Sequence, residues 1–397
     1  MIALSIIGSG VGSLYASTVL YDVPPAAPFE GDQWYNPYDV RDDRSTRWLK
    51  ANFHAHSHAW RGLTEGDQSA DDVVSAYRRM GYDVIALSNY HTLPPASDTS
   101  VFPVYEHGWN ISKSHRLVIG AQSVRWRDYP VGQHMLHQQE LIEQLRADGA
   151  VVAIAHPAMR NGHALASFES LSGYDALEVL NHFLPPAESQ WDRALSSGRA
   201  VWLLANDDTH DIRGIGETGV HWTLVRAPSA GVADITSAIR AGRTIGVRGH
   251  SGHTELEFLS LRMRGDTMEL DVRGPIDSVR LVGQAGAVRF AADADTLETR
   301  GDTIRVRAVA DPRDGYLRAV IIGREPSARA GAPQALYLNP VVRYDGRTLG
   351  VSGAVISVQR TAAFRLSVIG LLTAIVAPHV ARLGNARARR RQVPVAS

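Results

Sequence analysis

The pattern of apolar and polar residues changes once along the chain, near residue 250. Before that point, short apolar runs alternate with segments that have apolar residues at helical spacing. Repeated strand and helix units of this kind predict a parallel sheet or barrel. The clearest strand candidates are residues 48–54, 83–88, 150–155, 176–180 and 200–205.

After residue 255 the apolar residues recur with period two, as in Met268–Val272 and Ile304–Val309. This spacing is typical of half-buried antiparallel strands. The sequence therefore predicts an α/β domain over residues 48–250 and an antiparallel β domain over residues 251–345. Linkers are predicted on either side, at 24–47 and 346–360.

Both ends of the chain are apolar. Residues 1–21 carry no charged side chain, and about 20 apolar residues span a bilayer core as a helix. We expect a membrane anchor at 1–23 and a second membrane segment at 361–382, with a basic tail at 383–397. Because arginines next to a span favour the cytoplasmic side, the domains would then be extracytoplasmic.

Other interpretations of the two ends remain open. The first segment is also compatible with a cleaved signal peptide or a buried core segment. The second is also compatible with an amphipathic surface helix. We expect one or both ends to bind a membrane.

Charge and cysteine content exclude several classes of function. The chain has 41 basic and 41 acidic residues, so the overall charge does not indicate a nucleic-acid partner. It has no cysteine, which excludes disulfides, cysteine-based zinc sites and a thiol nucleophile. Its 16 histidines are numerous, and their positions carry the chemical information.

Polar residues gather where the predicted strands end, which is the rim on which βα barrels build active sites. His54 and His56 are two residues apart, so they share one face of a strand and can bind one ion together. His156 and Asp208 end later strands. Imidazole and carboxylate ligands suit zinc, manganese or iron. We therefore expect a divalent metal site.

These motifs together resemble the PHP (polymerase and histidinol phosphatase) family. Its strand ends carry His-x-His, Asp-His, Gly-x-Glu, Gly-His, Ala-His-Pro and Asp-x-His in this order. The similar segments here are Asn52–His56, Gly81–Tyr90, Gly120–Gln122, Gly132–His134, Ile154–Pro157 and Asp208–His210. The resemblance implies a PHP-type (β/α)7 barrel with an appended C-terminal antiparallel β domain.

The resemblance also implies a metal-dependent phosphoesterase with up to three ions. The first ion would be bound by His54, His56 and Asp208. The second would be served by His134 and His156, and the third by His210. The substrate would be a small phosphorylated or anionic molecule.

This sequence departs from the family pattern at three places. Arg61, Gln122 and the pair Asn89–Tyr90 align with an aspartate, a bridging glutamate and an Asp-His pair. These changes remove negative charge, and a cluster of cations needs carboxylates to offset its repulsion. We therefore predict one ion, and at most two.

The departures also suggest new roles. Arg61 could hold a phosphate oxygen, and His210 could act as an acid or base. His58 or His91 could restore a ligand in a shifted register. Two other functions stay open: a non-catalytic domain that binds an anionic ligand, and a metallohydrolase that acts on a non-phosphate substrate.

Overall fold

The computed structural model describes residues 10–39, 45–58, 68–214, 216–324, 332–347, 349–350 and 353–391. The chain divides into two compact units. One runs from Val23 to Gly353, and the other joins the two ends of the chain, up to Asp22 and from Ala354.

A five-stranded sheet lies in the larger unit, with the strand order β5-β6-β7-β8-β9. Every residue of these strands is buried, which explains why they are mostly apolar in sequence. The pairs β7–β8 and β8–β9 are parallel, whereas β5–β6 and β6–β7 are antiparallel. The strands are β5 (Val104–His107), β6 (Arg116–Ile119), β7 (Val151–Ile154), β8 (Ala176–Leu180) and β9 (Trp202–Ala205).

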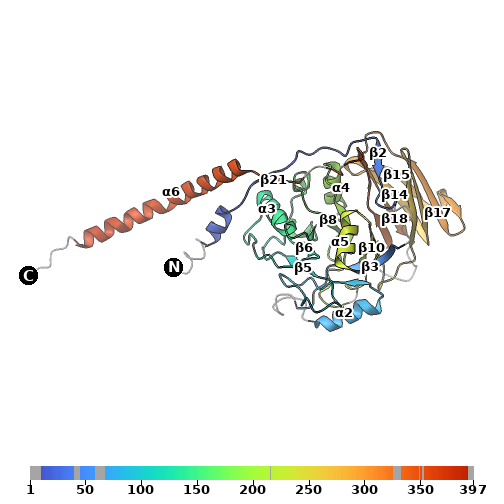
Figure 1. The fold of residues 1–397 in the computed structure, drawn as a ribbon, viewed down its shortest axis with the longest axis horizontal. Coiled ribbons are helices and arrows are strands. Elements are labelled where there is room, and N and C mark those ends of the chain that lie inside the picture. Colours follow the sequence, from blue (N-terminus) through green and yellow to red (C-terminus); the bar gives the residue numbers. More distant parts are fainter. Residues whose placement is uncertain are drawn as a thin grey trace, which may run out of the picture. The chain divides into compact units, whose positions relative to one another are not determined.

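A larger sheet has the order β15-β14-β18-β19-β11-β10-β3-β4, with β20 paired to β18 and β2 to β20. It contains strands from both sides of residue 250, so the two sequence patterns meet in one sheet (Figure 1). Its members are β2 (Gln33–Tyr35), β3 (Arg47–Asn52), β4 (Val84–Ile85), β10 (His221–Ala227), β11 (Thr244–Arg248), β14 (Ile276–Gly283), β15 (Ala287–Asp293), β18 (Tyr316–Gly323), β19 (Ala335–Leu338) and β20 (Val341–Tyr344).

The mixed α/β class is as predicted, but the closed (β/α)7 barrel is not found among the described residues. Single bridges link the two sheets, between Ala86 and Phe102 and between Ala55 and Thr209. Several neighbouring strands run antiparallel, including β3 with β10. Since a βα barrel requires parallel neighbours, apolar runs alone could not reveal this arrangement.

Four helices pack around these sheets, and α2 shows why they form where they do. The Ser69 hydroxyl caps its start by accepting a hydrogen bond from the Asp72 backbone N–H at 3.1 Å. Val73 and Tyr77 are fully buried on its inner face. The helices are α2 (Ala70–Arg79), α3 (Met135–Arg146), α4 (Glu188–Ser196) and α5 (Val232–Arg240); the 3₁₀ turns are η2 (Met159–Asn161), η3 (Leu165–Glu169), η4 (Gln284–Gly286) and η5 (Ala294–Thr296).

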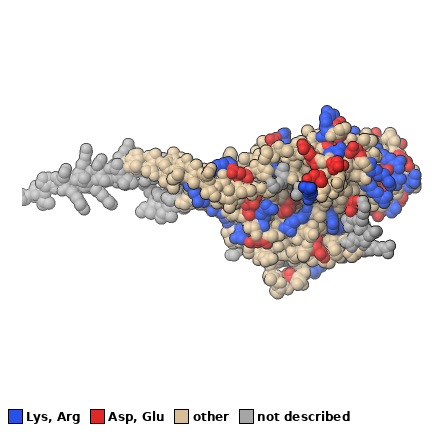
Figure 2. Space-filling model, turned by 45° about the horizontal axis from the view of Figure 1, so that its top comes forward, with Lys and Arg blue, Asp and Glu red and all other residues tan. Residues whose placement is uncertain are grey.

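A separate antiparallel sheet has the order β12-β13-β17-β16, as the period-two spacing predicts. Met268 and Leu270 point inward and are fully buried, while Asp271 forms an ion pair with Arg305 at 2.7 Å. Basic and acidic side chains are intermingled at the right of the view in Figure 2. The strands are β12 (Glu257–Arg264), β13 (Thr267–Arg273), β16 (Glu298–Arg300) and β17 (Thr303–Val309).

The smaller unit pairs β1 (Tyr21–Asp22) with β21 (Val355–Ile356), and α6 (Val358–Arg391) follows. Within the described residues, no helix combines the length and apolar character needed to cross a bilayer. The spans predicted at 1–23 and 361–382 therefore gain no support, and residues 1–9 lie outside the described residues.

Candidate metal centre

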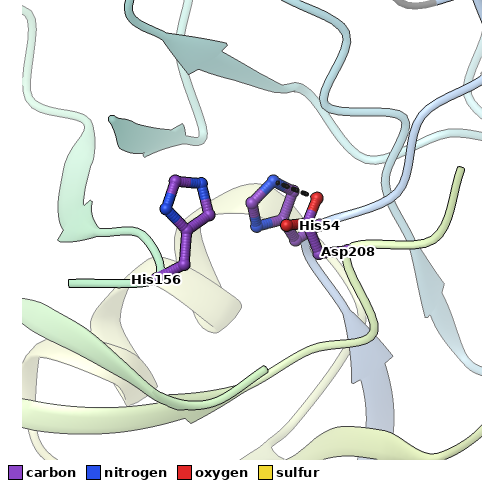
Figure 3. Close-up of side chains that lie close together, drawn as sticks. All are labelled: His54, His156 and Asp208. Atoms are coloured by element: carbon purple, nitrogen blue, oxygen red, sulfur yellow. Dashed lines mark ion pairs between the residues drawn. The ribbon is translucent and has the colours of Figure 1, made fainter. Parts of the chain in front are cut away.

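Three strand ends of the larger unit bring together five of the side chains predicted to act at the site. His54 and His56 follow β3, His156 follows β7, and Asp208 and His210 follow β9. The His54 and His156 rings are 5.6 Å apart, and Asp208 lies beside His54 in Figure 3. The His54 Nε2 atom is 2.9 Å from the Asp208 Oδ1 atom.

Glu106, which the sequence did not single out, occupies the middle of this cluster. Its Oε2 atom is 3.4 Å from His54 Nε2 and 3.1 Å from His56 Nε2. Its Oε1 atom is 3.1 Å from His156 Nε2 and also contacts His115 Nδ1. The two oxygens of one buried carboxylate thus face two different groups of imidazoles.

His156 Nε2 and Glu106 Oε1 are within hydrogen-bond distance, but other atoms that meet here have no hydrogen-bond partner in the described structure. The nitrogen His54 Nε2 and the oxygens Glu106 Oε2 and Asp208 Oδ1 are buried without a hydrogen-bond partner in the described structure. The same holds for both ring nitrogens of His56. Buried polar atoms are nearly always paired, so a group of orphaned atoms in one place needs an explanation.

A divalent cation explains the spacing of these atoms. Ligand atoms about 2.0–2.1 Å from a tetrahedral zinc are about 3.4 Å from one another. His54 Nε2 is 3.4 Å from Glu106 Oε2 and 2.9 Å from Asp208 Oδ1. His56 Nε2 is 3.1 Å from the same Glu106 oxygen and 3.4 Å from the same Asp208 oxygen. All four atoms are lone-pair donors when the imidazoles are neutral, so the residues fit a metal.

Overlapping triads in the cluster could each hold an ion. They are His54–His156–Asp208, His54–His56–Glu106, His56–Asp208–His210 and Glu106–His115–His156. Because the triads share ligands, they do not define independent sites. The structure thus provides residues that could bind divalent metal.

Glu178 positions the ring of His54 from behind. Its Oε1 atom lies 2.9 Å from His54 Nδ1, and its Oε2 atom accepts a hydrogen bond from the His156 backbone N–H at 2.8 Å. Asn181 and Asn206 each donate to this carboxylate at 2.9 Å. A carboxylate that fixes the rear nitrogen of a histidine is a common support for metal ligands.

The electric field of the cluster favours charged forms. Burial alone would lower the pKa of His54, but the neighbouring carboxylates, Asp208 foremost, outweigh it and raise the pKa. The pKa values of His56 and His156 are raised for the same reason. Conversely, the imidazoles outweigh the effect of burial on Glu106 and Asp208 and lower the pKa of both carboxyl groups.

Two of the candidate ligands have strained backbones. His156 has φ of +26° and Asp208 has φ of +53°, in the region that non-glycine residues rarely adopt. Asp208 is held there by a hydrogen bond from its N–H to the His54 carbonyl at 2.9 Å. Such strain persists only where surrounding structure enforces it, and it gathers at functional sites.

One predicted site residue, His134, is not among the ligands of this cluster, and another cannot be placed. His134 is an exposed residue at the start of α3 and is in none of the candidate triads of the described structure. Arg61 lies outside the described residues. Gln122, which was aligned with the family's bridging glutamate, is exposed on a loop after β6. Glu106 is the carboxylate that lies between the imidazoles.

The other departures from the family pattern have clear positions. The Tyr90 ring stacks on the His56 ring, with centroids 5.0 Å apart. Asn89 accepts from the Ser57 N–H at 3.0 Å and donates to the Ser57 hydroxyl at 2.8 Å, so it fixes the loop after β3. His91 faces the Arg125 carbonyl at 3.0 Å, and neither it nor His58 joins a described triad.

Glu178 and Glu106 could have been found from one signal in the sequence. Both lie in short apolar strands, and glutamate is almost never fully buried unless it is paired. His115 was harder to find, because it lies before the start of β6 rather than at its end. It reaches the cluster because β6 runs antiparallel to β5 and β7. The expected order of strand ends therefore could not place it.

Comparisons with known proteins add little. No family model and no curated protein matches this chain. One similar solved structure is a two-domain protein from Bacteroides vulgatus containing a predicted PHP-like metal-dependent phosphoesterase. It is 14% identical, with a TM-score of 0.40, over 78% of this chain and 100% of that chain. At this level the likeness carries no inference about the site.

Proposed function

We propose that this chain is a divalent-metal-dependent hydrolase that acts on a small phosphate ester. The observation that carries the proposal is the set of orphaned acceptor atoms on His54, His56, Glu106 and Asp208. A structural cluster of this size would be satisfied by hydrogen bonds, whereas these atoms face one another at ligand spacing. When bound, a divalent ion polarises a phosphoryl oxygen and lowers the pKa of water.

Charge supports one ion, and at most two, of zinc, manganese or iron type. The orphaned set contains two carboxylates, Glu106 and Asp208, and Glu178 adds a third behind His54. Two divalent ions bring a charge of +4 against these three negative charges, whereas three ions bring +6. Two ions would leave a small excess of positive charge. Three ions would leave a larger excess, which is costly in a buried cluster. Glu106 replaces the carboxylate whose loss Gln122 had suggested.

His210 is proposed to handle the proton of the reaction. Its Nδ1 atom is 2.9 Å from the Asp208 carbonyl, which can only accept, so Nδ1 carries the hydrogen and Nε2 is left as an acceptor. Ester hydrolysis adds water across the P–O bond, so Nε2 can take the proton that the attacking water loses and return it to the leaving oxygen. His210 is partly exposed and its ring is 4.4 Å from that of His56, so it can reach both water and cluster.

A lysine at the cluster rim favours an anionic substrate. The Lys113 ammonium lies 5.6 Å from the centre of the Tyr90 ring, which itself stacks on His56. A cation in this place could meet a phosphate oxygen, the role first expected of Arg61. The position of Lys113 supports a phosphate ester over a neutral substrate.

The test combines metal analysis with hydrolysis of an aryl phosphate monoester, a phosphate diester and a carboxylic ester by the full chain. We expect metal-dependent turnover of at least one phosphate ester that is lost with chelator and restored by zinc or manganese. Metal content without turnover would favour an anion-binding domain. Turnover of the carboxylic ester alone would contradict the phosphate assignment.

A further inference from the structure

A second cavity lies at the opposite ends of β8 and β9 from the metal cluster. It has a volume of about 170 Å³ and is lined by residues before these two strands and by the last residues of α3 and α5. The five residues of β8, at about 3.3 Å each, separate the two ends by roughly 16 Å. The charged and hydroxyl residues in its wall are Arg146, Ser172, Tyr174, Asp175, Arg199 and Arg240.

Three buried side chains in this wall have polar atoms without a hydrogen-bond partner in the described structure. They are the Ser172 hydroxyl, the Tyr174 hydroxyl, and the Nε and Nη1 atoms of Arg199. The exposed fractions of these residues are 3%, 4% and 3%. Each of these groups is a hydrogen-bond donor, and an arginine nitrogen cannot accept. Orphaned donors around one cavity indicate a ligand that accepts hydrogen bonds.

The charges of the wall indicate that this ligand is an anion. Arg146 and Arg240 join Arg199, and Asp175 is the carboxylate among the lining residues. Asp175 is already engaged, since one oxygen accepts from the Val152 N–H at 2.9 Å and the other lies 3.6 Å from Arg240 Nε. Arg146 also lies 3.6 Å from Glu143, outside the lining, so the arginines still outnumber the carboxylates by three to two.

Of the three arginines in the cavity wall, Arg199 is the one whose surroundings indicate a binding site. Arg146 and Arg240 end helices, where a cation also offsets the helix dipole, so their presence alone would mean little. Arg199 belongs to no helix; its Nη2 atom donates to the carbonyls of Pro24 and Glu169 at 2.8 and 3.0 Å. This anchoring fixes the guanidinium while Nε and Nη1 stay unpaired.

We infer that this cavity is a binding site for a small oxyanion of the phosphate type, separate from the metal cluster. The volume is below the roughly 300–1,000 Å³ of pockets that bind drug-sized ligands. It suits free phosphate or the phosphate group of a larger molecule that extends outward. Arginine forks and hydroxyl donors together match the several oxygens of such an anion.

The test measures binding of inorganic phosphate to the full chain by calorimetry and thermal shift, with chloride at matched ionic strength as the reference. Two variants probe the cavity: Arg146→Gln, and the pair Ser172→Ala with Tyr174→Phe. Arg273→Gln is the matched control, because Arg273 is similarly exposed, at 44% against 42%, and is likewise paired with a glutamate. The same measurements are made on proteins that also carry His54→Ala and His56→Ala, so that phosphate bound at the metal cluster does not contribute.

We expect both cavity variants to weaken phosphate binding by about tenfold or more, as loss of charge-assisted or buried hydrogen bonds implies. Arg273→Gln should bind as the wild type does, and neither the cavity variants nor Arg273→Gln should change the metal content of a protein that keeps His54 and His56. Without phosphate, the Ser172 and Tyr174 pair should be as stable as the wild type, because the removed hydroxyls have no partner. Unchanged phosphate affinity in the cavity variants would overturn the inference, as would a loss of stability in that pair without phosphate.

Discussion

The two ends of the strand pair β8 and β9 present buried polar atoms of opposite kinds. At the ends that precede Asn181 and Asn206, the orphaned atoms are carboxylate oxygens, which accept, and imidazole nitrogens, which accept when they carry no hydrogen. At the starts, near Asp175 and Arg199, they are hydroxyl and guanidinium groups, which donate. Acceptors without donors indicate a cation, and donors without acceptors indicate an anion.

The same contrast distinguishes two adjacent carboxylates that follow β9, one with a structural role and one that could bind a ligand. Asp207 and Asp208 are adjacent and both buried, but their surroundings differ. Asp207 accepts hydrogen bonds from Tyr77 and from the N–H groups of three residues that follow one another, 219–221, at 2.7–2.9 Å. Asp208 has an oxygen with no hydrogen-bond donor in the described structure. The first carboxylate serves the fold, and the second is available for a ligand.

The largest effect should come from removing the two histidines that follow β3, His54 and His56. We predict that His54→Ala combined with His56→Ala abolishes metal-dependent turnover, a loss of at least about a thousandfold, because three of the four candidate triads lose one or two ligands. Bound metal should fall with it. His134→Ala is the control, and it should keep both metal and activity because His134 lies outside the described triads. Retained turnover in the double variant would disprove the mechanism.

The next effect tests which carboxylate lies between the imidazoles. Glu106→Gln keeps the shape and removes the charge, and we predict a loss of metal affinity of about a hundredfold or more, since it changes a direct ligand. Gln122→Ala should leave affinity unchanged, because Gln122 is exposed on a distant loop. Competition with a coloured chelator measures both. Equal effects of the two substitutions would return the bridging role to the original alignment.

The neighbouring aspartates should respond in opposite ways. We predict that Asp208→Asn weakens metal binding and leaves the metal-free fold intact, whereas Asp207→Asn destabilises the fold by about 2–4 kcal/mol. Asp207→Asn is expected to destabilise the fold because the Asp207 carboxylate accepts hydrogen bonds from four donors, and an amide has only one oxygen to accept them. Chemical denaturation of chelator-treated protein checks the stabilities. Loss of metal in Asp207→Asn without loss of stability would reverse the two roles.

The last prediction concerns the dependence of metal affinity on pH. The pKa values of His54, His56 and His156 are raised, so in the metal-free protein their stabilising contribution is complete below pH about 6.5. That contribution is lost as the pH rises through the folded-state pKa values. Because metal needs neutral imidazoles, affinity should fall about tenfold for each unit by which the pH is lowered, per proton taken up, and the fall should begin above pH 6.5.

Zinc affinity measured between pH 9 and 6 tests this prediction. Glu106 and Asp208 have lowered pKa values and stay charged across the range, so they should not contribute to the slope. An affinity that does not change with pH would show that imidazoles are not ligands.

The sequence predicted the parts of the site that depend on local spacing. His54 with His56, and Asp208 with His210, lie two residues apart at strand ends, and such pairs need only local geometry to come together. The structure also brings His156 to them. The antiparallel β sheet from Glu257 was equally local, because alternation alone determines its buried face.

The sequence could not predict what depends on strand order. Glu106 reaches the cluster from β5, which runs antiparallel to β6, and nothing in the four residues of that strand indicates its neighbours. His134 was assigned because the segment Gly132–His134 resembles the Gly-His motif of the family, but His134 is the N-cap of α3. The anion cavity has no motif, since its donors come from four separate segments.

The central claim is that the orphaned acceptors of His54, His56, Glu106 and Asp208 hold divalent metal. Elemental analysis of the full chain, purified without chelator, tests it most directly. We predict one or two ions of zinc, manganese or iron per chain in the wild type, and a clear loss in Asp208→Asn but not in His134→Ala. A metal-free wild type that takes up no added zinc would contradict the account, and three tightly bound ions would contradict the predicted count.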